Sequence, residues 1–104
     1  MQINIKTKNL ELTSEIEDYI KEKIGHLQKY DKQIMETDVR LTSGKEHSSE
    51  NKFRAEVTMH LPKTLFRAEA KGQGVYAAID LVSEKLERQL ERYKNKIFGK
   101  GKRK

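Results

Sequence analysis

The chain has 104 residues, of which 37% are charged and 35% are hydrophobic, and its formal net charge is +6. This length predicts one domain with a small core, and no apolar run reaches the roughly 18 residues of a membrane span. The absence of cysteine excludes disulfides and thiolate metal sites and favours a cytosolic location.

The first predicted element is a strand over residues 2–7. Ile3 and Ile5 alternate with polar residues and should face inward. The N-terminal segment lacks the long apolar stretch of a signal peptide, which again favours the cytoplasm.

A helix is predicted next, ending at about Lys29. Thr13 or Ser14 should cap its start, and Ser14 with Glu17 has the spacing of a capping box. Its apolar residues recur at helical spacing, which gives one face for the core: Ile16, Tyr19, Ile20, Ile24 and Leu27. Residues 30–32 should turn the chain towards the next element.

Three further runs of alternating apolar and polar residues predict three strands. Their apolar positions are Met35, Thr37, Val39 and Leu41, then Phe53, Ala55, Val57, Met59 and Leu61, then Phe66, Ala68 and Ala70. A polar loop over residues 42–50 should join the first two of these strands. Residues 61–64 contain the only proline and should form a hairpin turn.

A long helix is predicted from Tyr76 to Lys96, after Gly72 and Gly74 and before Gly99 and Gly101. At about 100° per residue its side chains separate into three stripes. The apolar stripe holds Tyr76, Ile79, Val82, Leu86, Leu90, Tyr93 and Ile97; the acidic stripe holds Asp80, Glu84, Glu87 and Glu91; the basic stripe holds Lys85, Arg88, Arg92 and Lys96. Separation of the signs leaves a positive ridge whose spacing suits a chain of phosphates.

The order β-α-β-β-β-α predicts an α+β fold, a four-stranded sheet with two helices on its one apolar face. The three strands after the first helix should form an antiparallel meander because their connections are short. We expect one domain over residues 1–98 and a flexible basic tail over 99–104. Residues 1–92 hold 16 basic and 16 acidic residues, whereas residues 93–104 hold six basic residues and no acid.

The last helix resembles that of the ribosome hibernation promoting factors, a family that includes the inhibitor called protein Y. The resemblance rests on residues 74–80 (Gly-Val-Tyr-Ala-Ala-Ile-Asp), 85–90 (Lys-Leu-Glu-Arg-Gln-Leu) and 93–94 (Tyr-Lys). Residues of the first strand and first helix agree as well: Asn4, Ile5, residues 10–13, Ile16, Lys23, Leu27, Lys29 and Tyr30. The resemblance covers roughly residues 1–97.

The resemblance implies a fold similar to double-stranded RNA-binding domains with an added first strand, and a role without catalysis. Family members occupy the mRNA and tRNA channel of the small ribosomal subunit and block translation under stress or in stationary phase. It implies contacts to ribosomal RNA from Lys85, Arg88 and Arg92 on the second helix and from Lys23 on the first. The basic stripe adds Lys96.

Two further residues of the first helix are RNA-binding candidates. His26 stands where the family often has lysine, which weakens that contact near neutral pH, and Lys29 continues the same side of the helix. If this edge faces the second helix, two positive rows converge on one RNA surface.

Other features have simpler readings. The four tyrosines should lie in the core or at its rim, and residues 72–74 lack the pattern of a nucleotide-binding loop. His26, His47 and His60 lack metal-ligand spacing, and no set of residues suggests a nucleophile or an acid–base pair. We therefore expect no enzyme, no cofactor, no metal, no membrane contact and no small-molecule substrate, and a monomer for this chain.

Two other functions stay open on the residues alone. One is a general double-stranded RNA-binding module, and the other is a protein-interaction domain whose basic helix face meets an acidic partner. The sequence also leaves open whether the chain is a short form or the first domain of a longer protein. Long members of the family add a C-terminal domain that pairs two ribosomes.

Overall fold

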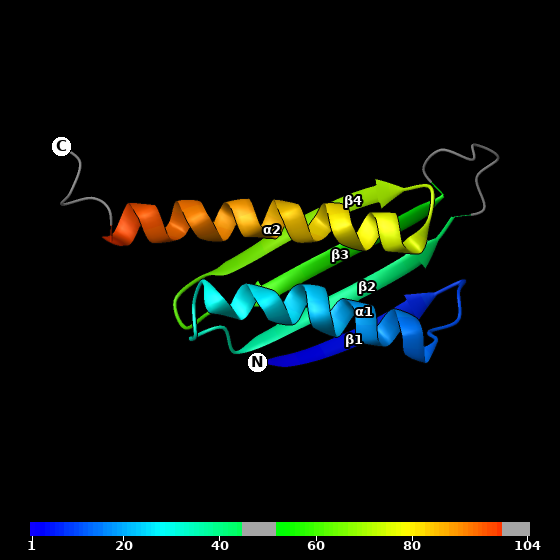
Figure 1. The fold of residues 1–104 in the computed structure, drawn as a ribbon, viewed down its shortest axis with the longest axis horizontal. Helices are drawn as coiled ribbons and strands as arrows, with labels where there is room; N and C mark the ends of the chain where they lie inside the picture. Colours follow the sequence, from blue (N-terminus) through cyan, green and yellow to red (C-terminus); the bar gives the residue numbers. More distant parts are fainter. Residues whose placement is uncertain (45–51, 99–104) are drawn as a thin grey trace.

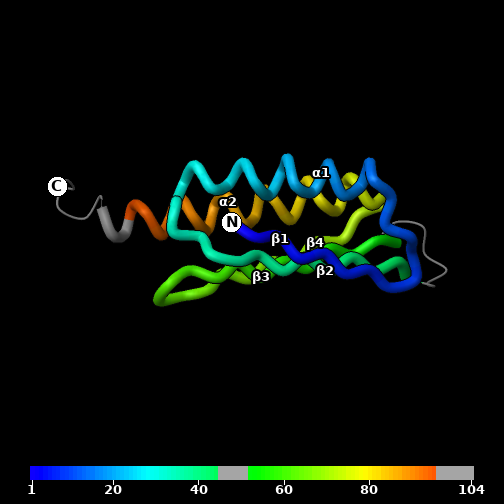
Figure 2. Tube along the Cα trace, turned by 90° about the horizontal axis from the view of Figure 1, so that it is seen from below, coloured from blue at the N-terminus to red at the C-terminus, as the bar shows by residue number. Residues whose placement is uncertain are grey.

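The computed structural model describes residues 1–44 and 52–98, with side chains described up to residue 95. They form a four-stranded sheet with two helices on one face (Figures 1 and 2). In chain order the elements are β1 (Gln2–Lys8), α1 (Ser14–Gly25), the 3-10 helix η1 (His26–Lys29), β2 (Glu36–Ser43), β3 (Phe53–His60), β4 (Leu65–Gly72) and α2 (Val75–Phe98). The predicted element order and α+β class are confirmed. Residues 45–50 of the predicted loop, His47 among them, and the tail 99–104 lie outside the described residues.

The strands lie in the order β1-β2-β3-β4. The predicted meander is confirmed, since β2, β3 and β4 pair antiparallel, while β1 pairs parallel to β2 at the sheet edge. The register sets Ile5 beside Val39, and Val57 beside both Val39 and Ala68. Apolar side chains therefore share the face that the helices cover, and polar side chains share the open face.

The core lies between the sheet and the two helices. Its fully buried large side chains come from every layer and include Ile20, Ile24, Leu27, Leu41, Met59, Ile79, Leu86 and Leu90. Each such burial stabilises the fold by about 1.5–3 kcal/mol. Met35 was expected to continue the alternation of β2, but it is 59% exposed. The strand begins one residue later, and Ile34 fills the core instead.

Thr13 is the N-cap of α1. Its backbone is extended and its Oγ1 accepts a hydrogen bond from the Ile16 amide at 3.2 Å. The predicted capping box of Ser14 and Glu17 is therefore wrong, because Ser14 is already the first helical residue. Glu17 forms an exposed ion pair with Lys21 instead. The first helix was predicted to end at about Lys29. The α-helix itself ends at Gly25, and η1 continues it to Lys29 with a tighter turn.

Helix α2 is slightly longer than predicted and extends past the end of the sheet (Figure 1). It lies beside α1 and runs in the same direction (Figures 1 and 2). Gly72, the last residue of β4, is buried where α2 begins: a Cβ atom there would lie 3.0 Å from the Ala78 amide nitrogen. Glycine at this position thus permits the close approach that seats α2 on the sheet.

Candidate nucleic-acid interface

Three of the predicted RNA-binding residues lie together on the outer flank of α2. Lys85, Arg88 and Arg92 are all exposed, and their spacing places them along one side of the helix. This side borders β4, since Lys85 Nζ donates a hydrogen bond to the Glu69 carbonyl oxygen at 2.7 Å. We call Lys85, Arg88 and Arg92 the basic ridge. The side chain of Lys96, which the sequence added to this row, lies outside the described residues.

The ridge keeps its charge. Within the described part of the chain, no ion pair of 4.0 Å or less involves Lys85, Arg88 or Arg92. In particular, the intrahelical pair of Glu84 with Arg88 that the spacing allows is not formed. The partner of Lys85 is a neutral carbonyl, so its charge is not cancelled. The result is a row of three exposed cations along one side of α2.

The opposite flank of α2 carries the acidic stripe and faces α1. The Tyr19 hydroxyl donates a hydrogen bond to Asp80, and the Tyr30 hydroxyl donates one to Glu87. Lys23 Nζ lies 3.7 Å from Asp80. The expectation that two positive rows converge is therefore wrong. The acids of α2, rather than its basic ridge, lie opposite the cations of α1.

These contacts change the titration of the two tyrosines. The hydrogen bond to Asp80, followed by burial, raises the pKa of Tyr19 to about 12. The hydrogen bond to Glu87, followed by burial, raises the pKa of Tyr30 to about 12. Both phenols stay protonated at neutral pH and remain donors to the carboxylates, which ties the acids of α2 to α1.

A hollow of about 320 Å³ separates the two helices on their solvent side. One wall holds Lys23 of α1 with His26 and Leu27 of η1, and the other wall belongs to α2 and holds Asp80, Ser83, Glu84 and Glu87. Tyr76, expected on the apolar face, is 43% exposed and packs edge-on against Tyr19, with ring centroids 4.8 Å apart. It is a rim residue, as the rim reading of the tyrosines allowed.

The candidates of the first helix are thus set apart from the ridge. Lys23 and His26 line the hollow, and Lys29 lies over the Tyr30 ring at 5.3 Å from its centroid. Lys23 lies over the Tyr19 ring at 5.6 Å in the same way. Each lysine is held by a neighbouring aromatic ring. The predicted set of cations therefore divides into two groups with a row of acids between them.

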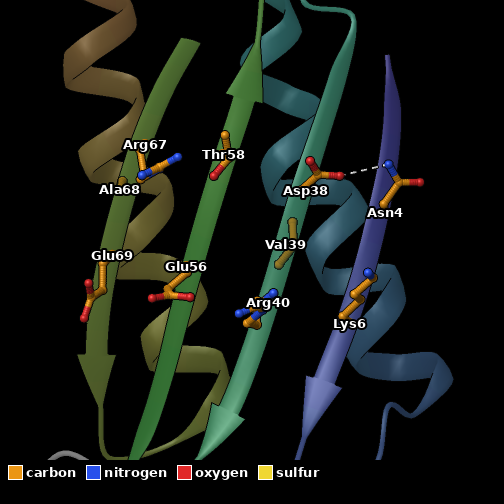
Figure 3. A pocket seen from close by; sticks show the side chains of 10 residues that line it. All are labelled: Asn4, Lys6, Asp38, Val39, Arg40, Glu56, Thr58, Arg67, Ala68 and Glu69. Atoms are coloured by element: carbon orange, nitrogen blue, oxygen red, sulfur yellow. Dashed lines mark hydrogen bonds between the residues drawn. The ribbon is translucent and has the colours of Figure 1, made fainter.

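The open face of the sheet has a second hollow, of about 420 Å³ (Figure 3). Its lining holds three cations, Lys6, Arg40 and Arg67, and three carboxylates, Asp38, Glu56 and Glu69. The amide of Asn4 donates to Asp38, which lowers the pKa of that carboxyl, and His60 adds to the effect. The charges of this lining balance, so the hollow itself offers phosphates no net attraction.

Other site types have no support in the described residues. No cluster of three or more His, Asp or Glu residues there could hold a metal ion. His60 points to the open face and contacts Asp38 at 3.1 Å. Helices long and apolar enough to cross a membrane are absent from the described residues.

The sequence missed the tyrosine–carboxylate pairs and the hydrogen bonds from α2 to β4. Gln89 donates to the Arg67 carbonyl oxygen at 3.1 Å, beside the similar bond of Lys85. The sequence did carry a signal for the tyrosine–carboxylate pairs, namely tyrosines at the edge of the apolar stripe of the first helix. The pattern alone does not say which flank of α2 they would meet.

Comparison with known proteins identifies relatives of the whole described chain. The family model described as Sigma 54 modulation protein / S30EA ribosomal protein matches residues 3–97. A ribosome hibernation promotion factor of Picosynechococcus sp. is 37% identical over 101 residues, 96% of this chain and 52% of that protein. The chain therefore spans about half the length of that relative.

Two further relatives match over most of both chains. A ribosome hibernation promoting factor of Azotobacter vinelandii is 36% identical over 96 residues, 92% of this chain and 85% of that protein. The crystal structure of the N-terminal domain of Thermus thermophilus Protein Y superposes with a TM-score of 0.78 at 33% identity, covering 89% of this chain and 99% of that one.

Proposed function

Because this chain belongs to the Sigma 54 modulation protein / S30EA ribosomal protein family, we propose that it is a ribosome hibernation factor. It binds the small ribosomal subunit in the mRNA and tRNA channel and inhibits translation under stress or in stationary phase. The names of relatives that cover almost all of this chain support the role. The site of action is the cytoplasm, where ribosomes work.

The basic ridge of α2 carries the proposal for the binding surface. Lys85, Arg88 and Arg92 present three cations without an acid within ion-pair distance. Arginine can bind a phosphate through two parallel hydrogen bonds, and lysine acts as a point charge. Ribosomal RNA offers phosphates along a fixed path, and releasing their counterions drives binding. Lys23, His26 and Lys29 would add a second, weaker contact from the α1 side.

The proposed mechanism is occlusion. A rigid α+β domain held in the channel by phosphate contacts takes the space that mRNA and tRNA need, and no bond is made or broken. Hydrogen bonds from Tyr19 of α1 and from Tyr30, the residue after η1, support this, because they hold Asp80 and Glu87 on the flank that faces α1.

The test removes the ridge and compares it with an equal loss of charge elsewhere. The triple variant Lys85→Ala/Arg88→Ala/Arg92→Ala should lose co-sedimentation with small subunits while its helical circular dichroism stays unchanged. The control Lys6→Ala/Arg40→Ala/Lys71→Ala removes three cations from the open sheet face and should still pellet. A ridge variant that still pellets would contradict the binding surface. Equal affinity for plain duplex RNA would identify a general double-stranded RNA module instead.

A further inference from the structure

An exposed leucine begins the row that the basic ridge continues. Leu81 precedes Lys85 by four residues, Arg88 by seven and Arg92 by eleven, so all four lie along one side of α2. Leu81 is 42% exposed, and Ala77, one turn earlier, is exposed as well. The ridge therefore has an apolar end, about 10 Å along the helix axis from Arg88.

This leucine lies outside the hydrophobic core of the described residues. Among the described residues it belongs neither to the buried core nor to the partly buried side chains packed against the core. Tyr76, the other large exposed apolar residue of α2, packs on Tyr19. Met35 and Leu65 lie at the beginnings of β2 and β4, away from the row. Only Leu81, among these exposed apolar side chains, stands in line with the cations.

The neighbours of Leu81 indicate what it contacts. An apolar side chain beside cations suits a ligand with an apolar surface next to anionic groups. Unpaired RNA nucleotides have this chemistry, since their base faces are open while their phosphates remain charged. A regular RNA duplex hides its base faces by stacking and offers mainly phosphates and hydroxyls.

Building on the proposed function, we propose that Leu81 with Ala77 is a base-contacting site that selects RNA with an unpaired nucleotide beside the phosphates held by Arg88 and Arg92. The ridge then binds phosphates without regard to sequence, and its apolar end distinguishes unpaired segments of ribosomal RNA from continuous duplex. Leu81 is a specificity-determining residue of this surface.

The test exploits opposite expectations for added charge. In Leu81→Lys the ridge gains a cation, so a purely electrostatic surface would bind small subunits more tightly. If Leu81 contacts a base, affinity for small subunits should fall about fivefold, because the substitution removes apolar side-chain area that the RNA would bury. The matched control Met35→Lys adds the same charge at an exposed apolar position elsewhere and should leave the affinity unchanged.

Two RNA probes separate the sources of the contact. With an RNA hairpin carrying an internal loop of unpaired nucleotides, Leu81→Lys should bind more weakly than the parent. With the same hairpin fully paired, it should bind as tightly or more tightly. Loss on small subunits without loss on the looped hairpin would assign the contact to a ribosomal protein and overturn the inference.

The remaining outcomes separate this inference from the proposed function. A parent chain that binds small subunits, with Leu81→Lys equal or tighter, would overturn only the role of Leu81. A parent chain that does not bind small subunits would overturn both. Circular dichroism of each variant should match the parent because the substituted side chains are exposed.

Discussion

The two flanks of α2 carry opposite charges and are treated oppositely by the fold. On the flank towards α1, Asp80 and Glu87 accept hydrogen bonds from Tyr19 and Tyr30. On the flank towards β4, the basic ridge is open to solvent and has no acidic partner among the described residues. Two acids of this helix are thus bonded to neighbouring tyrosines, whereas its three ridge cations form no ion pair among the described residues.

A chain whose body has balanced charges can bind a polyanion when those charges are segregated on its surface. Residues 1–92 hold equal numbers of basic and acidic residues, so the attraction has to come from their arrangement. The apolar stripe fixes the rotation of α2 on the sheet, and the position of α1 then decides which charged stripe meets a neighbour. Local geometry, rather than net charge, creates the ridge.

The largest effect should come from removing the core that fixes this rotation. Leu86 is fully buried beneath α2, and Leu86→Ala should lower the free energy of unfolding by about 2–5 kcal/mol. Urea unfolding would measure it. The matched change Leu81→Ala, on the exposed side of the same helix, should cost no more than about 0.5 kcal/mol. Equal costs would show that Leu86 does not anchor α2.

The next largest effect separates the flanks by their salt dependence. The double variant Arg88→Ala/Arg92→Ala removes both arginines of the ridge. The slope of log affinity for small subunits against log salt concentration should then decrease in magnitude by about 1.5. The counterpart Glu84→Gln/Glu91→Gln changes two charges on the acidic stripe and should leave that slope unchanged. Similar flattening in both variants would mean that the two flanks do not differ in their distance from the RNA.

A smaller effect concerns the tyrosine ties at high pH. The pKa of Tyr19 and of Tyr30 is raised from 10.0 to about 12 in the folded chain. The stabilisation from these bonds is therefore complete below pH 10 and is lost as the pH rises through about 12, because the unfolded chain releases its phenol protons first. Urea unfolding between neutral pH and about pH 12 should show this loss, and Tyr19→Phe/Tyr30→Phe should reduce its steepness. An equally steep loss in the double variant would contradict the ties.

The smallest effect compares two members of the ridge. Lys85 donates a hydrogen bond to the Glu69 carbonyl oxygen at 2.7 Å, whereas Arg88 forms no ion pair among the described residues that RNA binding would have to break. Arg88→Ala should therefore weaken binding to small subunits about tenfold, and Lys85→Ala about threefold or less. Sedimentation over a range of subunit concentrations would measure both. A larger loss from Lys85 would place the RNA nearer to β4.

Most of the fold followed from local patterns. Alternation at Val39 and Val57 predicted strands with the correct inward face, and the residues 61–64 turn is closed by a hydrogen bond from the Leu61 amide to the Thr64 carbonyl. The capping box failed because Thr13 and Ser14 are adjacent and both can cap. Local spacing does not decide between them, whereas the packing of Ile16 does.

The sequence indicated which residues to consider for the candidate site, but it did not predict how they lie relative to one another. Helical spacing was enough to group Lys85, Arg88 and Arg92, which share one flank because they share one helix. It could not place Lys23 and His26 relative to them, because these lie on a different element. Whether Lys23 and His26 face Asp80, Glu84 and Glu87 depends on which side of α2 the first helix occupies.

Local sequence patterns were enough to predict most elements, their inward faces and the separation of charges on the last helix, because these depend on neighbours within one turn or one strand. Only the tertiary structure decided that the acids face α1, that the basic ridge borders β4 and that Leu81 stands exposed at its end. Those relations join residues as far apart as Tyr19 and Asp80, and they are fixed by how whole elements pack rather than by any local spacing.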